Sequence, residues 1–284
     1  MVRDYDQAAL DLQYDVGAHY AGMEAFRERH AAERAAANAR ARGQGYAMLD
    51  IPYGAHGREK LDHFRGAAGA PLLAYIHGGY WRSRDRSDFS FLAPPWVARG
   101  IHVACLGYPL CPEVRLGRIV DSCRQALAFL ATEAKDFGFD AARIHVAGHS
   151  AGGHLAAMMM ATDWQALGLP ADLLKSGTAI SGIYDLAPLA LTKINADIKL
   201  DAGEIASLSP IRLAPRHRGP LIVTYGGKET DEFARQAGDF AAAWRRQAKT
   251  VSEIASPGFY HFNAVDQLAE PASALFQAVV EAIG

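Results

Sequence analysis

Short apolar runs alternate with longer helical segments through most of this 284-residue chain, and no other feature constrains the fold as strongly. Strands are expected over residues 46–53, 71–77, 101–106, 143–148, 177–182 and 220–226, with 250–256 as a weaker seventh. Helices are expected over residues 89–99, 116–137, 152–167, 230–247 and 271–283. Several strands are almost continuously apolar, which is typical of strands buried on both faces. The alternation therefore predicts an α/β fold, with a mainly parallel central sheet and helices on both faces.

A sheet of this kind binds ligands at the carboxyl ends of its strands. The loops that follow Ile76, Val146, Tyr225 and Ile254 are therefore expected to carry the chemistry of the protein. Between them these loops contain paired glycines, a serine, acidic side chains and a histidine.

The first candidate is Ser150, which stands in the sequence Gly-His-Ser-Ala-Gly at 148–152. This G-x-S-x-G pattern is that of a nucleophile elbow, in which a strained turn between a strand and a helix exposes a serine. The glycines let the backbone pass closely, and the free N–H groups at a helix start favour negative charge. The pattern alone is a weak signal, but here it follows an expected strand and opens an expected helix. This context indicates a nucleophilic serine.

Paired glycines at 78 and 79 follow His77 at the end of another expected strand. Attack on a carbonyl group creates an oxyanion, which must be met by N–H donors already held in place. In acyl-transferring enzymes such donors come from glycines after an early strand and from the residue that follows the nucleophile. The N–H groups of Gly78, Gly79 and Ala151 are therefore the candidate oxyanion hole.

A serine nucleophile needs a base, and the base needs a carboxylate that orients it. In folds of this type the acid and then the histidine follow the serine along the chain. The chain has eleven histidines, and His261 lies in a loop near the C-terminus after the last expected strand. His261 is therefore the candidate base.

The candidate acid lies in the loop after the strand expected over 220–226. Glu229 comes first in that loop, whereas Asp231 stands where the next helix is expected to begin. Thr230 or Asp231 is expected to cap that helix, because short polar side chains accept hydrogen bonds from its free N–H groups. Acidic residues near a helix start are common without catalysis. Glu229 is therefore preferred as the acid, with Asp231 as the alternative.

Charge and cysteine content argue against several other classes of protein. The 29 basic and 31 acidic residues nearly balance, so no nucleic-acid or membrane partner is expected. Three cysteines are too few for a disulfide scaffold, which favours a reducing compartment and a cytoplasmic location.

No signal peptide or membrane span is expected. Neither a metal-ligand spacing nor a nucleotide-binding glycine motif is present, so no metal and no cofactor are expected.

The N-terminal region has a different pattern, in which one long helix is expected from about residue 17 to residue 42. Alanine and arginine dominate residues 31–42, and alanine favours helix strongly. Two interpretations stay open: a solvated helix packed on the body of the protein, or a cap over a substrate pocket. The chain is expected to form one domain over 1–284, with 1–45 as this N-terminal helical segment.

These residues together resemble the α/β-hydrolase superfamily, and within it the kynurenine formamidase (arylformamidase) group and its HGG-type esterase relatives. The resemblance runs from about Asp50 to the C-terminus. It rests on HGGYW at 77–81, GHSAGGHLAA at 148–157, SGIYDLAPL at 181–189, LSPI at 208–211 and GGKETDEFARQA at 226–237, together with LDLQYD at 11–16. It implies an α/β-hydrolase fold, and it places the acid on Glu229, where some members have aspartate, and the base on His261.

The resemblance also implies the reaction. A serine hydrolase of this group would release formate from an N-formyl aryl amide such as N-formylkynurenine, through an acyl-enzyme on Ser150. The alternative is a carboxylesterase acting on short-chain or aryl esters or carbamates, which would use the same catalytic residues. A non-catalytic binding protein of this fold would show a broken triad, whereas Ser150, Glu229 and His261 are all present.

The expected partner is a small-molecule substrate with an aromatic group. An aromatic wall is expected around it from Tyr80, Trp81, Tyr184, Phe259 and Tyr260. Ordinary core or loop packing is the alternative for each of these side chains. A homodimer is also open, since soluble proteins often form one.

Overall fold

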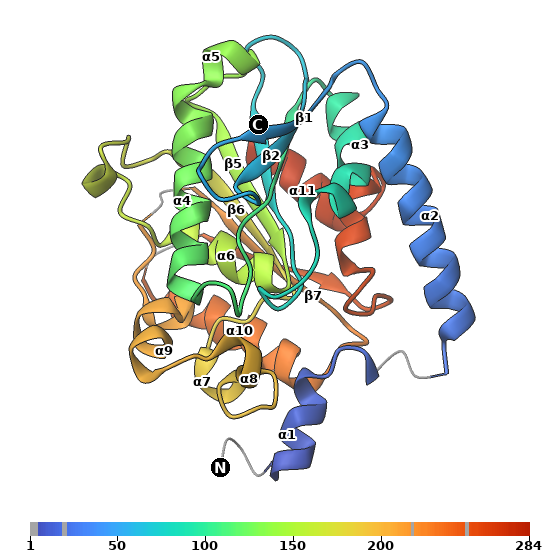
Figure 1. Ribbon diagram of the computed structural model, residues 1–284, viewed down its shortest axis with the longest axis vertical. Coiled ribbons are helices and arrows are strands. Elements are labelled where there is room, and N and C mark those ends of the chain that lie inside the picture. Colours follow the sequence, from blue (N-terminus) through green and yellow to red (C-terminus); the bar gives the residue numbers. More distant parts are fainter. Residues whose placement is uncertain (1–4, 19–21, 217–218, 248–249) are drawn as a thin grey trace.

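The computed structural model describes residues 5–18, 22–216, 219–247 and 250–284, and its centre is one eight-stranded sheet (Figure 1). The strands are β1 (Ala47–Pro52), β2 (Lys60–Phe64), β3 (Leu72–Ile76), β4 (His102–Leu106), β5 (Ile144–His149), β6 (Leu174–Ile180), β7 (Leu221–Gly226) and β8 (Val251–Ser256). Their order across the sheet is β1-β2-β4-β3-β5-β6-β7-β8. β2 is antiparallel to both neighbours, and every other pair is parallel. The predicted mainly parallel sheet is confirmed.

β2 is the strand that the apolar pattern did not predict. It contains Asp62 and His63, and both polar side chains are buried. The Asp62 carboxylate accepts hydrogen bonds from Arg86, at 3.2 Å, and from Arg42. Because its charge is paired inside the protein, the strand can be buried without an isolated ion. A pattern that counts apolar residues does not detect such a strand.

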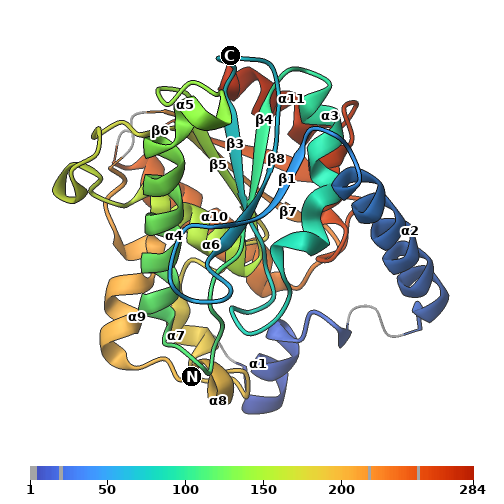
Figure 2. The ribbon, with the colours of Figure 1, turned by 45° about the horizontal axis from the view of Figure 1, so that its top comes forward.

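Helices cover both faces of the sheet (Figures 1 and 2). After β3 the α-helices are α3 (Ala93–Val97), α4 (Leu116–Thr132), α5 (Ala134–Phe137), α6 (Ala151–Met160), α7 (Leu186–Leu189), α8 (Asn195–Ile198), α9 (Ala202–Leu208), α10 (Asp231–Arg245) and α11 (Ala274–Ile283). The 3₁₀ helices are η2 (Arg86–Leu92), η3 (Gln165–Leu167), η4 (Pro210–Arg212) and η5 (Ala264–Ala269). Side chains from α4, α6 and α10 form the core on one face, and those from α3 and α11 form it on the other. The predicted two-sided arrangement is confirmed.

Several predicted helices are shorter or broken in the structure. The segment 89–99 is a 3₁₀ helix followed by α3, because Pro94 and Pro95 lack the N–H groups that a continuous α-helix requires. The segment 116–137 is divided at Glu133 into α4 and α5, and the segment 152–167 ends as an α-helix at Met160. The last helix begins at Ala274, where the preceding serine side chain caps it.

The N-terminal region forms two helices, which corrects the single helix expected from residue 17. They are α1 (Gln7–Tyr14) and α2 (Glu24–Arg42), and residues 19–21 of the expected helix lie outside the described residues. Gly22 has a φ of 80°, which a right-handed helix cannot include, so α2 begins after it.

α2 lies along one edge of the molecule (Figures 1 and 2) and packs against η2. The Asn38 side chain holds it there, since it donates to the carbonyl oxygen of Asp88 and accepts from the N–H of Phe91, each at 2.8 Å. Most side chains of α2 are at least partly exposed. The helix therefore attaches through a few specific polar contacts and not through a wide apolar face.

The three cysteines, Cys105, Cys111 and Cys123, are buried free thiols. Burial raises the pKa of Cys111 to about 11, so this side chain stays protonated at neutral pH. Buried in this way, the three cysteines pack as small apolar side chains. Within the described residues, no helix combines the length and the apolar character that crossing a membrane requires.

Candidate active site

Ser150 lies at the sharp turn between the end of β5 and the start of α6. Its backbone has φ 58° and ψ −122°, which is strained for a residue with a side chain. The flanking glycines are required by space. A Cβ on Gly148 would lie 2.0 Å from the carbonyl oxygen of Gly152, and a Cβ on Gly152 would lie 2.0 Å from that of Ile76. The motif therefore has the strand–turn–helix geometry of a nucleophile elbow.

Ser150, His261 and Glu229 form a continuous chain of hydrogen bonds. Nε2 of His261 lies 3.0 Å from the Ser150 hydroxyl, and Nδ1 lies 2.6 Å from a carboxylate oxygen of Glu229. Because an ionised carboxylate only accepts hydrogen bonds, Nδ1 carries the proton and Nε2 is free to accept from the serine. All three side chains are almost fully buried. The arrangement can transfer a proton from the serine to the imidazole.

Glu229 is fixed from two further directions. The hydroxyl of Ser181 and the N–H of Gly226 donate to its other carboxylate oxygen, at 2.5 and 2.6 Å. Asp231, the alternative acid, is the first residue of α10 and is exposed. The structure therefore brings Glu229, and not Asp231, against the imidazole.

Gly78 and Gly79 follow β3 and lie beside the elbow, since a Cβ on Gly78 would come 3.0 Å from the Cβ of Ser150. Gly79 has a φ of 110°, which favours glycine. Among the hydrogen bonds between described residues, none uses the N–H of either glycine. Ala151 begins α6, so its N–H has no acceptor within the helix. The three N–H groups named from the sequence are thus available next to Ser150.

His77 and Tyr108 support the glycine loop. Their rings stack with centroids 4.1 Å apart, and the Tyr108 hydroxyl donates to the carbonyl oxygen of His77 at 2.7 Å. Nδ1 of His77 lies 2.7 Å from the carbonyl oxygen of Gly78, to which it donates. Burial lowers the pKa of His77 to about 4, so the ring is neutral at pH 7. His77 therefore acts on the shape of the loop rather than as a charge.

His149 supports the loop that carries the candidate base, a contact that the sequence analysis did not predict. Its Nε2 donates to the backbone carbonyl oxygen of His261 at 2.8 Å. Burial, reinforced by the neighbouring His261, holds the pKa of His149 well below its usual range. The described residues contain no group of three or more His, Cys, Asp or Glu side chains that could bind a metal ion.

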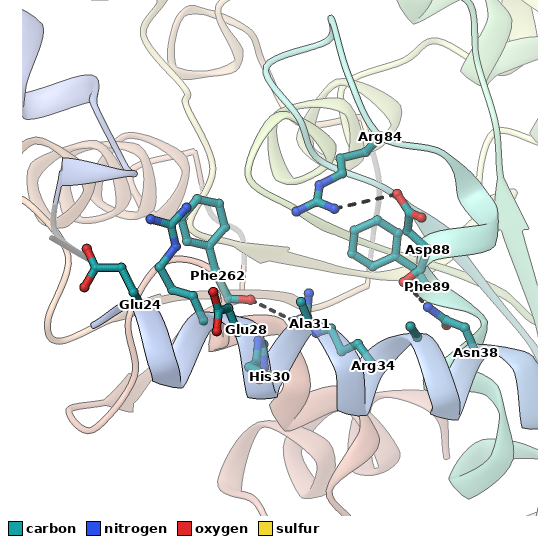
Figure 3. A pocket seen from close by; sticks show the side chains of 12 residues that line it. Glu24, Glu28, His30, Ala31, Arg34, Asn38, Arg84, Asp88, Phe89 and Phe262 are labelled. Carbon is teal, nitrogen blue, oxygen red and sulfur yellow. Dashed lines mark hydrogen bonds and ion pairs between the residues drawn. The ribbon is translucent and has the colours of Figure 1, made fainter. Parts of the chain in front are cut away.

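A cavity of about 270 Å³ opens beside Ser150, and a groove of about 590 Å³ shares a wall with it. Arg34, Arg84, Phe89 and Phe262 line both spaces. Figure 3 shows the groove between α2 and the segment that carries Arg84, Asp88 and Phe89. α2 is therefore the outer wall of the space that leads to the candidate nucleophile. The sequence analysis missed Arg34, Arg84 and Phe89, because nothing in their local patterns connects them with Ser150.

Two of the predicted substrate contacts are core residues, which corrects that expectation. Trp81 is fully buried, and its ring lies edge-on to His154 with centroids 5.0 Å apart. Tyr184 is also fully buried and stacks on Phe240 at 4.1 Å. Neither lines the cavity beside Ser150. Both side chains are large and aromatic. Although they are close to the site in sequence, they lie in the core, where their burial is favourable.

Of the other three predicted substrate contacts, one lines the cavity beside Ser150 and two do not. Tyr80 lines the cavity, whereas Phe259 and Tyr260 do not. Phe259 packs against the core on the face of α3 and α11, and the amine of Lys228 lies 4.7 Å from the ring centroid of Tyr260. Phe262, from the same loop as His261, lines the cavity instead. The aromatic lining is therefore smaller than expected.

Known proteins resemble the chain along most of its length. The BD-FAE family model matches residues 63–175. A kynurenine formamidase from Salmo salar is 30% identical over 254 residues, which cover 86% of this chain and 85% of that protein. The chain belongs to the kynurenine formamidase family. A second relative of that name, from Danio rerio, is 28% identical over 253 residues, with 86% and 85% of the two chains covered.

Solved structures share the fold of this member of the kynurenine formamidase family. A crystal structure from Silicibacter sp. tm1040, presented as a candidate thioesterase, has a TM-score of 0.82 and 33% identity, covering 95% of this chain and 98% of the other. Esterase B from Lactobacillus rhamnosis has a TM-score of 0.69 and 20% identity, covering 94% and 93%, and it supports the fold alone. This member of the kynurenine formamidase family has the α/β-hydrolase fold, and it is a hydrolase that acts on a small-molecule substrate.

Proposed function

We propose that this hydrolase removes the formyl group from an N-formyl aryl amide of the N-formylkynurenine type, through an acyl-enzyme on Ser150. The observation that carries the proposal is the chain of hydrogen bonds from Ser150 through His261 to Glu229. This arrangement lies next to the N–H groups of the glycine loop, so that nucleophile, base and oxyanion donors meet at one point.

The reaction begins when the Ser150 oxygen attacks the formyl carbon and Nε2 of His261 takes the hydroxyl proton. The N–H groups of Gly78, Gly79 and Ala151 stabilise the oxyanion that forms. When the tetrahedral intermediate collapses, His261 gives its proton to the amide nitrogen and the aryl amine leaves. Water then attacks the formyl ester, with His261 again as the base, and formate leaves as the Ser150 hydroxyl is restored.

Glu229 orients the imidazole and stabilises its charged form. One of its oxygens bonds to Nδ1 of His261, and the other is occupied by Ser181 and Gly226. The carboxylate therefore has no freedom to turn away during the cycle. It also keeps the proton on Nδ1, so that Nε2 faces the serine at each step.

The cavity lining supports a leaving group that carries a carboxylate. Three arginines, Arg34, Arg82 and Arg84, line the space beside Ser150, and no acidic side chain among the described residues does. Arg34 is occupied by Asp266 and by the carbonyl oxygen of Phe262, and Arg82 pairs with Asp197. Within the part of the chain that the structure describes, the Arg84 guanidinium has only a long contact, 3.9 Å, with Asp88.

Arg84 is thus the arginine best able to bind a substrate anion. Its side chain is 54% exposed, and it lies at the wall shared by the cavity and the groove. We propose that Arg84 binds the carboxylate of the substrate and that α2 forms the outer wall of the pocket. Because α2 would then contribute to the substrate pocket, the N-terminal helical segment would belong to the same domain as the sheet.

The alternative function is a carboxylesterase that acts on short-chain or aryl esters or carbamates. It is favoured by the size of the outer groove, which has room for a large leaving group. Because both functions use the same catalytic residues, only substrate preference separates them.

The deciding experiment compares kcat/KM for N-formylkynurenine and p-nitrophenyl acetate on one preparation, with Ser150→Ala as the blank. We expect the formamide to be preferred by orders of magnitude. Reaction with the activated ester alone would support the esterase function, and substantial activity in Ser150→Ala would overturn the mechanism. A series from formyl to butyryl esters gives a second criterion, since a tight formyl site should discriminate sharply against longer acyl groups.

A further inference from the structure

Two consecutive residues at the end of α1, Gln13 and Tyr14, bond to both loops that flank Ser150. We propose that this pair is a positioning clamp that holds the glycine loop and the acid loop in register with each other. The proposal rests on the proposed function, since it assigns those loops to the oxyanion and to Glu229. Neither Gln13 nor Tyr14 is among the residues that line the cavity.

The bonds to the acid loop come from Gln13. Its backbone carbonyl oxygen accepts from the hydroxyl of Thr230 at 2.7 Å, and its side-chain oxygen accepts from the N–H of Glu232 at 3.1 Å. Thr230 is the N-cap residue of α10 but makes no side-chain cap bond there. Gln13 therefore caps α10 from outside, which corrects the expectation that Thr230 or Asp231 would do so. The residue next to Glu229 is thus fixed by α1.

The bond to the glycine loop comes from Tyr14. Its backbone carbonyl oxygen accepts from the hydroxyl of Tyr80 at 2.6 Å, inside the protein. Tyr80 directly follows Gly79 and has a φ of 48°, which is unfavourable for a residue with a side chain. A strained backbone persists only where its surroundings hold it, and this buried hydrogen bond is such a restraint.

The Tyr14 side chain also bonds to α10, so both residues of the clamp are attached to that helix. Its hydroxyl donates to the carboxylate of Glu232 at 2.9 Å, and Gln236 donates to the same hydroxyl at 3.1 Å. Arg235 pairs with Glu232, so the buried carboxylate is neutralised. Burial, reinforced by the charge of Glu232, raises the pKa of Tyr14 above its usual range, and the hydroxyl remains a donor.

The outer part of α1 is attached independently of these bonds. Gln7 donates to the carbonyl oxygen of Leu191, and Asp11 accepts from the N–H of Lys193, each at 2.8 Å. A substitution that removes one bond of the clamp should therefore leave α1 docked. This separation makes the positioning role testable without removal of the helix.

The experiment uses two conservative variants of the full chain, Tyr80→Phe and Gln13→Met. The first removes the hydroxyl that bonds to Tyr14, and the second removes the side-chain acceptor at nearly constant length. We expect kcat to fall about tenfold in each, with KM within about twofold, because small displacements of catalytic groups act on the transition state. The rate at which a fluorophosphonate labels Ser150 should fall by a similar factor.

The matched control is Tyr53→Phe, which removes another buried tyrosine hydroxyl, bonded to the carbonyl oxygen of Gly107. It should lower the melting temperature about as much as Tyr80→Phe and leave kcat unchanged. Equal losses of kcat in Tyr53→Phe and Gln13→Met would overturn the clamp, as would an unchanged labelling rate in Gln13→Met. The labelling rate does not depend on the natural substrate, so it decides the clamp even if the formamide proves not to be hydrolysed.

Discussion

The hydroxyl oxygen of Ser150 lies 3.0 Å from Nε2 of His261, although 111 positions separate the two residues in the chain. The loops after β5 and β8 meet because the parallel strands of the sheet end at one edge. A second hydrogen bond, from Nε2 of the His149 side chain to the backbone carbonyl oxygen of His261, also joins these two loops.

The choice of acid is tested by Glu229→Gln and Asp231→Asn. The first keeps the shape of the side chain but removes the charge that orients and stabilises His261, so kcat should fall by about 10³–10⁴. Asp231 is exposed at the start of α10, and its amide should lower kcat by no more than about twofold. Steady-state kinetics on both variants decides the matter, and the reverse order of effects would transfer the role to Asp231.

The glycine loop is tested by Gly79→Ala. A Cβ at this position would lie 2.3 Å from the backbone carbonyl oxygen of Ser83, and φ is 110°, so the loop must shift. Displacement of an oxyanion donor should lower kcat about 10²-fold. Gly138→Ala is the matched control: its φ is 86°, and no atom lies within 4 Å of the added Cβ. It should share the backbone strain and keep wild-type kcat, so equal losses in both variants would count against the donor role.

The assigned anion contact is tested by Arg84→Met. The variant should raise KM for N-formylkynurenine about tenfold, because a charge-assisted hydrogen bond to the substrate carboxylate is lost. Formanilide, which has the same formyl aryl amide but no carboxylate, should show an unchanged KM. Arg84→Lys should recover part of the affinity. If the two substrates respond alike, Arg84 contributes to the fold of the loop and not to recognition of the anion.

Stability should fall in mild acid because of buried histidines such as His63. Burial, reinforced by His102 and Arg65, lowers the pKa of His63 to about 3, from an ordinary value of 6.5. Between these two pH values the His63 side chain binds a proton in the unfolded chain but not in the folded chain. The stability present above pH 6.5 is therefore lost as the pH falls toward 3, by up to about 1.4 kcal/mol per pH unit.

Urea unfolding at several pH values from 7 to 4 measures this effect. His63→Leu should give a shallower dependence of the unfolding free energy on pH, whatever its effect on stability at pH 7. The comparison therefore uses slopes and not absolute values. An unchanged slope would show that His63 does not contribute to the acid sensitivity.

Local patterns were sufficient for the features that depend on neighbours in sequence. The elbow at 148–152 was predictable from its local G-x-S-x-G pattern between an expected strand and an expected helix, and the alternation of apolar runs was sufficient for the mainly parallel sheet. The same patterns failed for β2, where buried Asp62 is compensated by arginines from elsewhere in the chain. They also failed for Trp81 and Tyr184, because a large aromatic side chain suits a binding site and a core equally well.

By itself, the sequence determined the fold class and the loops that carry the candidate nucleophile, base and acid, because strand and turn periodicity is a property of short segments. Only the tertiary structure decided which carboxylate faces His261, which arginines reach the cavity, and that α1 caps α10 through Gln13. Each of these depends on a contact between segments distant in the chain. Such contacts follow from how the elements pack together, and hydrogen bonds between them leave no periodic signal in the residues that make them.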